Sequence, residues 1–195
     1  PRPVVIALHG NFDRPEWMCA AIAPVVGDRA FVLCPRGVPR RDAPEDDPRF
    51  THRPVRALLR EVAAAREALA LAHPGAIDAG PDVWLGFSLG AHRAAAVAVA
   101  DPARVPLLLL VEGGDALFES DAAGRYAASG GRVGVTCALA GCERRGRRLA
   151  ESLAGGSGAG MVERIETCHW CIDVMRPAMT RIFDWLVSSD PRFAP

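Results

Sequence analysis

Residues 83–96, "VWLGFSLGAHRAAA", decide the fold of this chain. A short apolar run leads directly into Ser88, and an alanine-rich segment with helical spacing follows. Residues 86–90 fit the pattern G-x-S-x-G, in which a serine occupies a strained turn between a strand and a helix. Small residues two positions before and after the serine are needed because neighbouring backbone crowds that turn. The stretch makes Ser88 a candidate nucleophile, provided that the flanking segments agree.

Apolar strands and amphipathic helices alternate on both sides of this stretch. Predicted strands are residues 3–9, 30–34, 82–87, 105–111, 132–139 and 161–166, and predicted helices are residues 15–26, 54–72, 88–100, 143–153 and 172–186. Continuous apolar runs are typical of parallel strands buried on both faces. The alternation predicts one α/β domain over residues 1–195, a mostly parallel six-stranded sheet with helices on both faces. The alternating run 161–166 suits an edge strand. The charged segment 36–54 is predicted to be a solvated loop or, alternatively, the rim of a pocket.

Composition excludes several classes of protein. The formal net charge is zero, which argues against broad electrostatic attraction to nucleic acid or anionic membranes. Half of the residues are hydrophobic, so disorder is not expected. No apolar run approaches the roughly 20 residues that span a bilayer, and no Gly-rich phosphate loop follows the first strand. We therefore expect a small-molecule substrate, no nucleic acid, no membrane insertion and no nucleotide cofactor.

A nucleophilic serine needs a base and donors for the oxyanion that develops on the substrate. His169 follows the last predicted strand, which is where such a base is expected. The backbone N–H after the nucleophile belongs to Leu89. A second N–H is expected from the loop "LHGNFD" after the first strand, where Asn11 follows the turn at Gly10.

These features together resemble the α/β-hydrolase fold, especially its small lidless dienelactone hydrolase-like and carboxylesterase/thioesterase-like branch. The resemblance rests on "VVIALHG", "CPRG", "GFSLGA" and the late "CHW" before a terminal helix containing "FDWL". It covers almost the whole chain and implies no cap domain. It also implies that Ser88 is the nucleophile and His169 the general base, with the N–H groups of Leu89 and Asn11 as the oxyanion hole.

The acid that would orient His169 is the point where the chain departs from the family pattern. The family places an Asp after the penultimate strand, but that loop reads "ALAGCERRG". Glu143 lies near the expected place, although it also suits the first turn of a helix. Asp115, after the fourth strand, is the alternative that some relatives use.

Six cysteines and several aromatic residues fall near the same strand ends. Cys168–Cys171, Cys137–Cys142 and Cys19–Cys34 are plausible disulfides, and they favour an exported protein. A zinc site on these cysteines would need further ligands, so we expect no metal. Convergence of Phe12, Trp17, Phe118 and Trp170 would make an apolar pocket.

The sequence thus predicts a serine hydrolase for a small carboxylic ester or thioester, without a cofactor. Two alternatives remain open at this point. One is a weak or inactive relative that binds a ligand or protein, and the other is a thiol-dependent or metal-binding protein.

Overall fold

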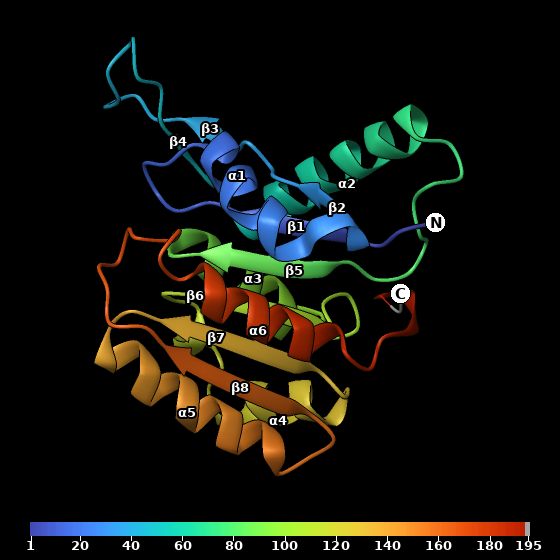
Figure 1. The fold of residues 1–195 in the computed structure, drawn as a ribbon, viewed down its shortest axis with the longest axis vertical. Coiled ribbons are helices and arrows are strands. Elements are labelled where there is room, and N and C mark those ends of the chain that lie inside the picture. The colour runs from blue at the N-terminus through green and yellow to red at the C-terminus, as the bar shows by residue number, and fades with distance from the viewer. Residues whose placement is uncertain (194–195) are drawn as a thin grey trace.

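The computed structural model describes residues 1–193 of the chain and is built around a parallel sheet. Six strands pair in the order β2-β1-β5-β6-β7-β8, and every pair is parallel (Figure 1). The predicted α/β class and six-stranded parallel sheet are confirmed, and the structure shows no large cap within residues 1–193.

The elements follow the predicted alternation closely. The strands are β1 (Val4–Leu8), β2 (Phe31–Leu33), β3 (Val38–Pro39), β4 (Phe50–Thr51), β5 (Val83–Phe87), β6 (Leu107–Val111), β7 (Arg132–Cys137) and β8 (Ala159–Arg164). The helices are α1 (Pro15–Val26), α2 (Val55–Ala72), α3 (Leu89–Ala100), α4 (Ser120–Ala128), α5 (Ala140–Ala154) and α6 (Arg176–Val187).

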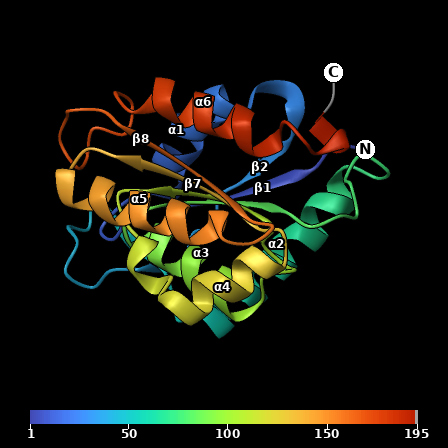
Figure 2. The same ribbon diagram turned by 90° about the horizontal axis from the view of Figure 1, so that it is seen from below.

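Two apolar cores lie on opposite faces of the sheet because side chains alternate along each strand. In β1, Val4, Ile6 and Leu8 face one core while Val5 and Ala7 face the other. Helices α1 and α6 cover one face and α2, α3, α4 and α5 cover the other (Figure 2). Both faces of the central strands are therefore buried, which explains their unbroken apolar sequences. No helix of the described residues is long and apolar enough to cross a membrane.

The order of the strands fixes where a ligand can approach. From β1 the chain moves outward to β2, and it returns to the other side of β1 as β5. The direction of winding thus reverses between β1 and β5. In open α/β sheets, ligands bind in the crevice beyond the carboxyl ends of the strands at such a point. The loop at Gly10 and the turn at Ser88 both lie there.

Several boundaries differ from the sequence predictions. Helix α4 was not predicted, because its buried residues are mostly alanine and its sequence contains Gly124, a poor helix former. The segment expected as a solvated loop contains the short antiparallel pair β3–β4, and an isolated bridge joins Phe50 to Asp13. Helix α6 begins at Arg176 rather than at Ile172, and Pro177 lies in its first turn. Strand β8 is the predicted edge strand.

Candidate active site

Ser88 occupies a strained turn between β5 and α3. Its backbone has φ 51° and ψ −114°, a region that L-residues rarely adopt. A Cβ on Gly86 would lie 2.4 Å from the backbone of Gly90, and one on Gly90 would lie 2.1 Å from the Leu8 oxygen. The glycines of the motif are therefore required by close backbone contacts. The N–H of Ser88 donates to the Val111 oxygen at 2.9 Å, which joins the turn to β6.

His169 lies between Ser88 and a carboxylate. Its Nε2 is 3.2 Å from Ser88 Oγ, and its Nδ1 is 3.0 Å from Glu112 Oε2. With Nδ1 protonated, the imidazole donates to Glu112, and the lone pair of Nε2 accepts the hydroxyl proton of Ser88. These contacts form a continuous Ser–His–Glu chain of hydrogen bonds, which is the arrangement that activates a serine for acyl transfer.

Glu112 is the first residue after β6 and is firmly held. Its side chain is 2% exposed, and Oε1 accepts hydrogen bonds from the N–H groups of Ala138 and, at 3.2 Å, Leu139. Its own N–H donates to the Thr136 oxygen at 3.0 Å. These bonds occupy one carboxylate oxygen and leave the other facing His169. The carboxylate is therefore fixed in orientation before any substrate binds.

Neither of the acids predicted from the sequence contacts His169. Glu143 lies in the first turn of α5, and its carboxylate binds Arg147 at 2.8 Å and Arg164 at 3.4 Å. The hydrogen bond from Arg147 lowers the pKa of Glu143. Asp115 is buried and pairs with Arg145 at 2.5 Å. The carboxylate beside the histidine comes from Glu112, so the expectation of Glu143 or Asp115 in that place was wrong.

Hydrogen bonds from His9 hold the loop after β1, which contains Asn11. His9 Nδ1 donates to the Gly10 oxygen at 2.7 Å, and His9 Nε2 lies 3.1 Å from the Arg36 oxygen. In a trans peptide the C=O and the next N–H point in opposite directions. Because His9 binds the Gly10 oxygen, the N–H of Asn11 points away from His9. The Asn11 side chain is fixed as well, since its Oδ1 accepts a hydrogen bond from Arg40 at 3.0 Å.

His52 supports the same loop, although its sequence context suggested only a loop residue. It is 4% exposed, its ring lies 4.1 Å from that of His9, and its Nε2 donates to the His9 oxygen at 3.0 Å. Burial, followed by the neighbouring His9, lowers the pKa of His52 from 6.5 to about 3. His52 is therefore neutral at pH 7. His92, by contrast, is exposed on α3, on the turn that follows Ser88.

All three suspected disulfides are present: Cys19–Cys34, Cys137–Cys142 and Cys168–Cys171. The second closes the loop whose N–H groups bind Glu112, and the third brackets His169. Sulfur and carboxylate atoms of Glu112, Cys137 and Cys142 cluster within 4.8 Å. The two sulfurs are bonded to each other, however, so they are not available as thiolate ligands for a metal.

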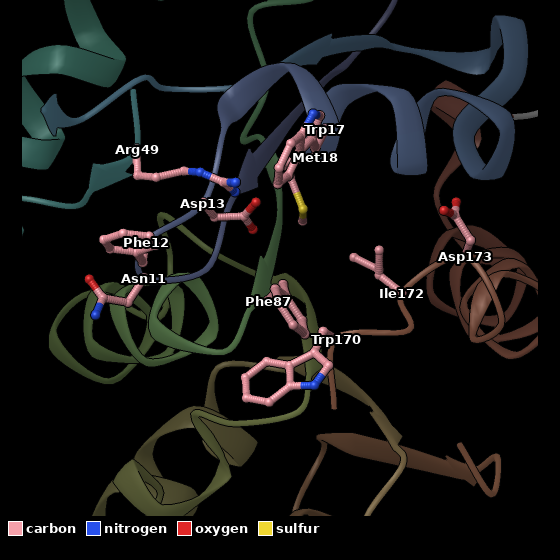
Figure 3. Close-up of a pocket in the computed structure, with 10 residues that line it drawn as sticks. All are labelled: Asn11, Phe12, Asp13, Trp17, Met18, Arg49, Phe87, Trp170, Ile172 and Asp173. Atoms are coloured by element: carbon pink, nitrogen blue, oxygen red, sulfur yellow. The ribbon is translucent and has the colours of Figure 1, made fainter. Parts of the chain in front are cut away.

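A cavity of about 350 Å³ opens at the carboxyl end of β5, where Phe87 forms part of its wall (Figure 3). It is lined by aromatic rings (Phe12, Trp17, Phe87, Trp170), by aliphatic side chains (Met18, Ile172) and by polar ones (Asn11, Asp13, Arg49, Asp173). Phe87 directly precedes Ser88 and Trp170 directly follows His169. The cavity therefore adjoins the hydrogen-bonded chain of the site.

Three of the four aromatic residues expected at this end converge on the cavity. Phe12, Trp17 and Trp170 line it. Phe118 is instead buried against Tyr126, with the rings edge to face at 5.3 Å. Arg49, from the segment expected as a loop or a pocket rim, also lines the cavity.

Comparison with known proteins identifies the fold. No protein-family model matches the sequence, and no curated protein matches it. Among solved structures, a carboxylesterase from Bacillus cereus has a TM-score of 0.58 and 16% identity, over 93% of this chain and 89% of that one. An S-formylglutathione hydrolase from Agrobacterium tumefaciens has a TM-score of 0.57 and 18% identity, over 96% of this chain and 84% of that one.

A third neighbour is an uncharacterised protein from Bacillus cereus. Its TM-score is 0.68 and its identity is 12%, and the match covers 97% of this chain but only 60% of that protein. Identities this low carry the architecture and not the activity. Together with the parallel sheet and the strained turn at Ser88, these matches show that the chain has the α/β-hydrolase fold.

Proposed function

We propose that the protein is a serine hydrolase that cleaves a small carboxylic ester or thioester. The observation that carries the proposal is the chain of contacts from Ser88 Oγ through His169 to Glu112 Oε2, at 3.2 and 3.0 Å. Ser88 is the nucleophile, His169 the general base and Glu112 the acid that orients it. The names of the carboxylesterase and S-formylglutathione hydrolase neighbours support this class of reaction.

Acylation begins when Ser88 Oγ attacks the carbonyl carbon of the substrate. His169 Nε2 takes the hydroxyl proton, and the carbonyl oxygen becomes an oxyanion. When that intermediate collapses, the bond from carbon to the leaving oxygen or sulfur breaks, and Nε2 returns its proton to the leaving group. Water then repeats the sequence on the acyl-enzyme and releases the acid. The carboxylate of Glu112 stabilises the imidazolium that forms in each step.

The oxyanion is bound by the N–H groups of Leu89 and Asn11. Leu89 is the first residue of α3, and N–H groups in a first helical turn have no partner within the helix. The Asn11 N–H is held away from His9 by the bond between that ring and the Gly10 oxygen. Both donors belong to backbone that is fixed before substrate binds, which is what makes such donors effective.

The alternative of an inactive relative is now less favoured. It was based on the lack of an evident acid, and Glu112 supplies a carboxylate at hydrogen-bond distance from His169. The thiol or metal alternative is also less favoured, because all six cysteines lie in disulfides.

The proposal is tested by steady-state hydrolysis of an acetate ester and of the matching thioester. We expect the wild type to cleave at least one, and Ser88→Ala to lower kcat by about 10⁴-fold or more. Retention of wild-type rates by folded Ser88→Ala protein would refute the role of Ser88. Failure of the wild type to cleave either substrate would count against the reaction class.

A further inference from the structure

The cavity at the carboxyl end of β5 has an aromatic lining drawn from separate parts of the chain. Phe12 comes from the loop after β1, Trp17 from α1, Phe87 from the end of β5 and Trp170 from the loop before α6 (Figure 3). Phe12, Trp17 and Trp170 are 40%, 49% and 79% exposed. Large aromatic rings left open to solvent and gathered at one cavity are typical of a ligand site.

The charged side chains on the cavity wall already have polar partners in the protein. The pairs are Asp13 with the N–H groups of Gly10 and Arg14, Arg49 with Asp47, and Asp173 with Arg176. A charged ligand would have to replace one of these contacts to find a counter-ion. The wall therefore favours an uncharged group.

The same arginines disfavour a cationic ligand, which would otherwise suit a cage of aromatic rings. The guanidinium carbon of Arg49 lies 4.5 Å from the centroid of the Trp17 ring and 5.8 Å from that of Phe12. Arg14 lies 5.3 Å from the Trp17 centroid. The protein's own cations thus occupy the cation–π positions on these rings.

The size of the cavity suits a single ring with a short linker. A cavity of about 150 Å³ is enough to hold benzene, and this one measures about 350 Å³. Phe87 lines the cavity, and the centroid of its ring lies 5.2 Å from that of His169, so a bound ring would lie within a short linker of the reacting atoms.

We propose that this cavity binds a planar, uncharged aromatic group carried by the ester substrate. The inference rests on the proposed function and narrows its substrate class. Trp17 and Trp170 are the residues that distinguish an aromatic ring from an aliphatic one. Because arginines lie over the Trp17 ring, we expect Trp17 to contact the ligand edge to face and Trp170 to stack on it. Both contacts favour an aromatic partner beyond what apolar burial provides.

The test uses two pairs of neutral esters that differ only in the ring. Methyl 3-phenylpropanoate is compared with methyl 3-cyclohexylpropanoate, and 2-phenylethyl acetate with 2-cyclohexylethyl acetate. We expect kcat/KM to favour the phenyl ester by about tenfold in at least one pair. The pair that shows the preference identifies whether the ring lies on the acyl or the alcohol side.

Variants of the two tryptophans test which residues cause the preference for phenyl over cyclohexyl esters. Trp17→Leu and Trp170→Leu keep an apolar side chain but remove the π-face, and each is expected to lower the phenyl to cyclohexyl ratio towards one. Leu71→Ala, at an exposed position near the end of α2, is the control and should leave the ratio unchanged. A ratio near one in both pairs for the wild type would overturn the inference, as would a ratio that neither tryptophan variant changes.

The outcome also separates this inference from the proposed function. If Ser88 reacts with a fluorophosphonate probe but neither phenyl ester is cleaved faster than its cyclohexyl partner, only the aromatic preference fails. If Ser88 does not react and no ester is cleaved, the proposed function fails together with the inference.

Discussion

Ser88 and Glu112 occupy equivalent positions at the ends of two neighbouring strands. Phe87 pairs with Val111 in the register of β5 and β6, and the residue after each has a positive φ, 51° for Ser88 and 56° for Glu112. The two side chains are thereby presented at the same edge of the sheet. The imidazole of His169 joins them, with one ring nitrogen directed at each. The register of the strands and the contact with His169 therefore both support Glu112 as the proposed acid.

Replacing Glu112 with Gln should disable the site. The amide oxygen of Gln can still accept from Ala138 and Leu139, but its NH2 group would then face His169 and favour the wrong tautomer. By analogy with such changes in Ser–His–Asp sites, we expect kcat to fall by about 10³–10⁴-fold. Steady-state kinetics on an acetate ester would measure this. Glu143→Gln is the matched control, and an equal loss in both variants would contradict the assignment.

The Cys137–Cys142 disulfide should matter for activity as well as for stability. Its closed loop carries the N–H groups of Ala138 and Leu139 that orient Glu112. Chain-entropy estimates give about 2 kcal/mol for a loop of this length and about 3 kcal/mol for the 15-residue separation of Cys19–Cys34. We therefore expect the Cys137→Ala/Cys142→Ala variant to lose about tenfold in kcat, which corresponds to about 1.4 kcal/mol.

The matched control is Cys19→Ala/Cys34→Ala. This variant should lose more stability in urea unfolding but less kcat. The reverse ranking in both measurements would show that the Cys137–Cys142 loop does not orient Glu112.

His52 should make folding sensitive to mild acid. Its folded pKa of about 3 is below the ordinary value of 6.5, so the unfolded state binds the additional proton between these pH values. Stability from this group is complete above pH 6.5 and is lost as the pH falls towards 3, by at most about 1.4 kcal/mol per pH unit. Urea unfolding at pH 7 and pH 5 would measure the loss. His52→Gln should reduce that difference, and an unchanged difference would contradict the prediction.

Two glycine-to-alanine substitutions should have opposite effects. A Cβ on Gly90 would lie 2.1 Å from the Leu8 oxygen, whereas one on Gly124 in α4 has no neighbour within 4 Å. We expect Gly90→Ala to cost at least about 1–3 kcal/mol and Gly124→Ala to stabilise by about 0.5–1 kcal/mol. Chemical denaturation distinguishes them. A neutral Gly90→Ala would mean that the turn at Ser88 has room for larger residues.

The sheet, the turn at Ser88 and the late histidine could all be predicted from the sequence. Buried strands require apolar runs, and the crowded turn at Ser88 requires glycines, so both leave a local pattern in the sequence. The sequence was not sufficient for the acid. Glu112 is the first polar residue after an apolar strand and precedes Gly113 and Gly114, which was a usable signal. Asp115 nearby fitted the family pattern better. The two are separated by the contact of His169 Nδ1 with Glu112 at 3.0 Å and by the pairing of Asp115 with Arg145.

Other features depended on tertiary contacts that no local pattern reveals. His52 lies in a charged segment that reads as solvated, yet it is buried against His9 because the β3–β4 segment folds back over the loop after β1. Helix α4 buries Ala122, Ala123, Tyr126 and Ala127, and the three alanines give a weak amphipathic signal because their side chains are small.

The most direct test of the central claim is covalent labelling with a fluorophosphonate probe, read by intact mass and peptide mapping. We expect one adduct per wild-type chain, located on Ser88, that is absent from Ser88→Ala and forms much more slowly in His169→Ala and Glu112→Gln. Folded wild-type protein that stays unlabelled, or that labels equally well without His169, would contradict the claim that Ser88 is activated by His169 and Glu112.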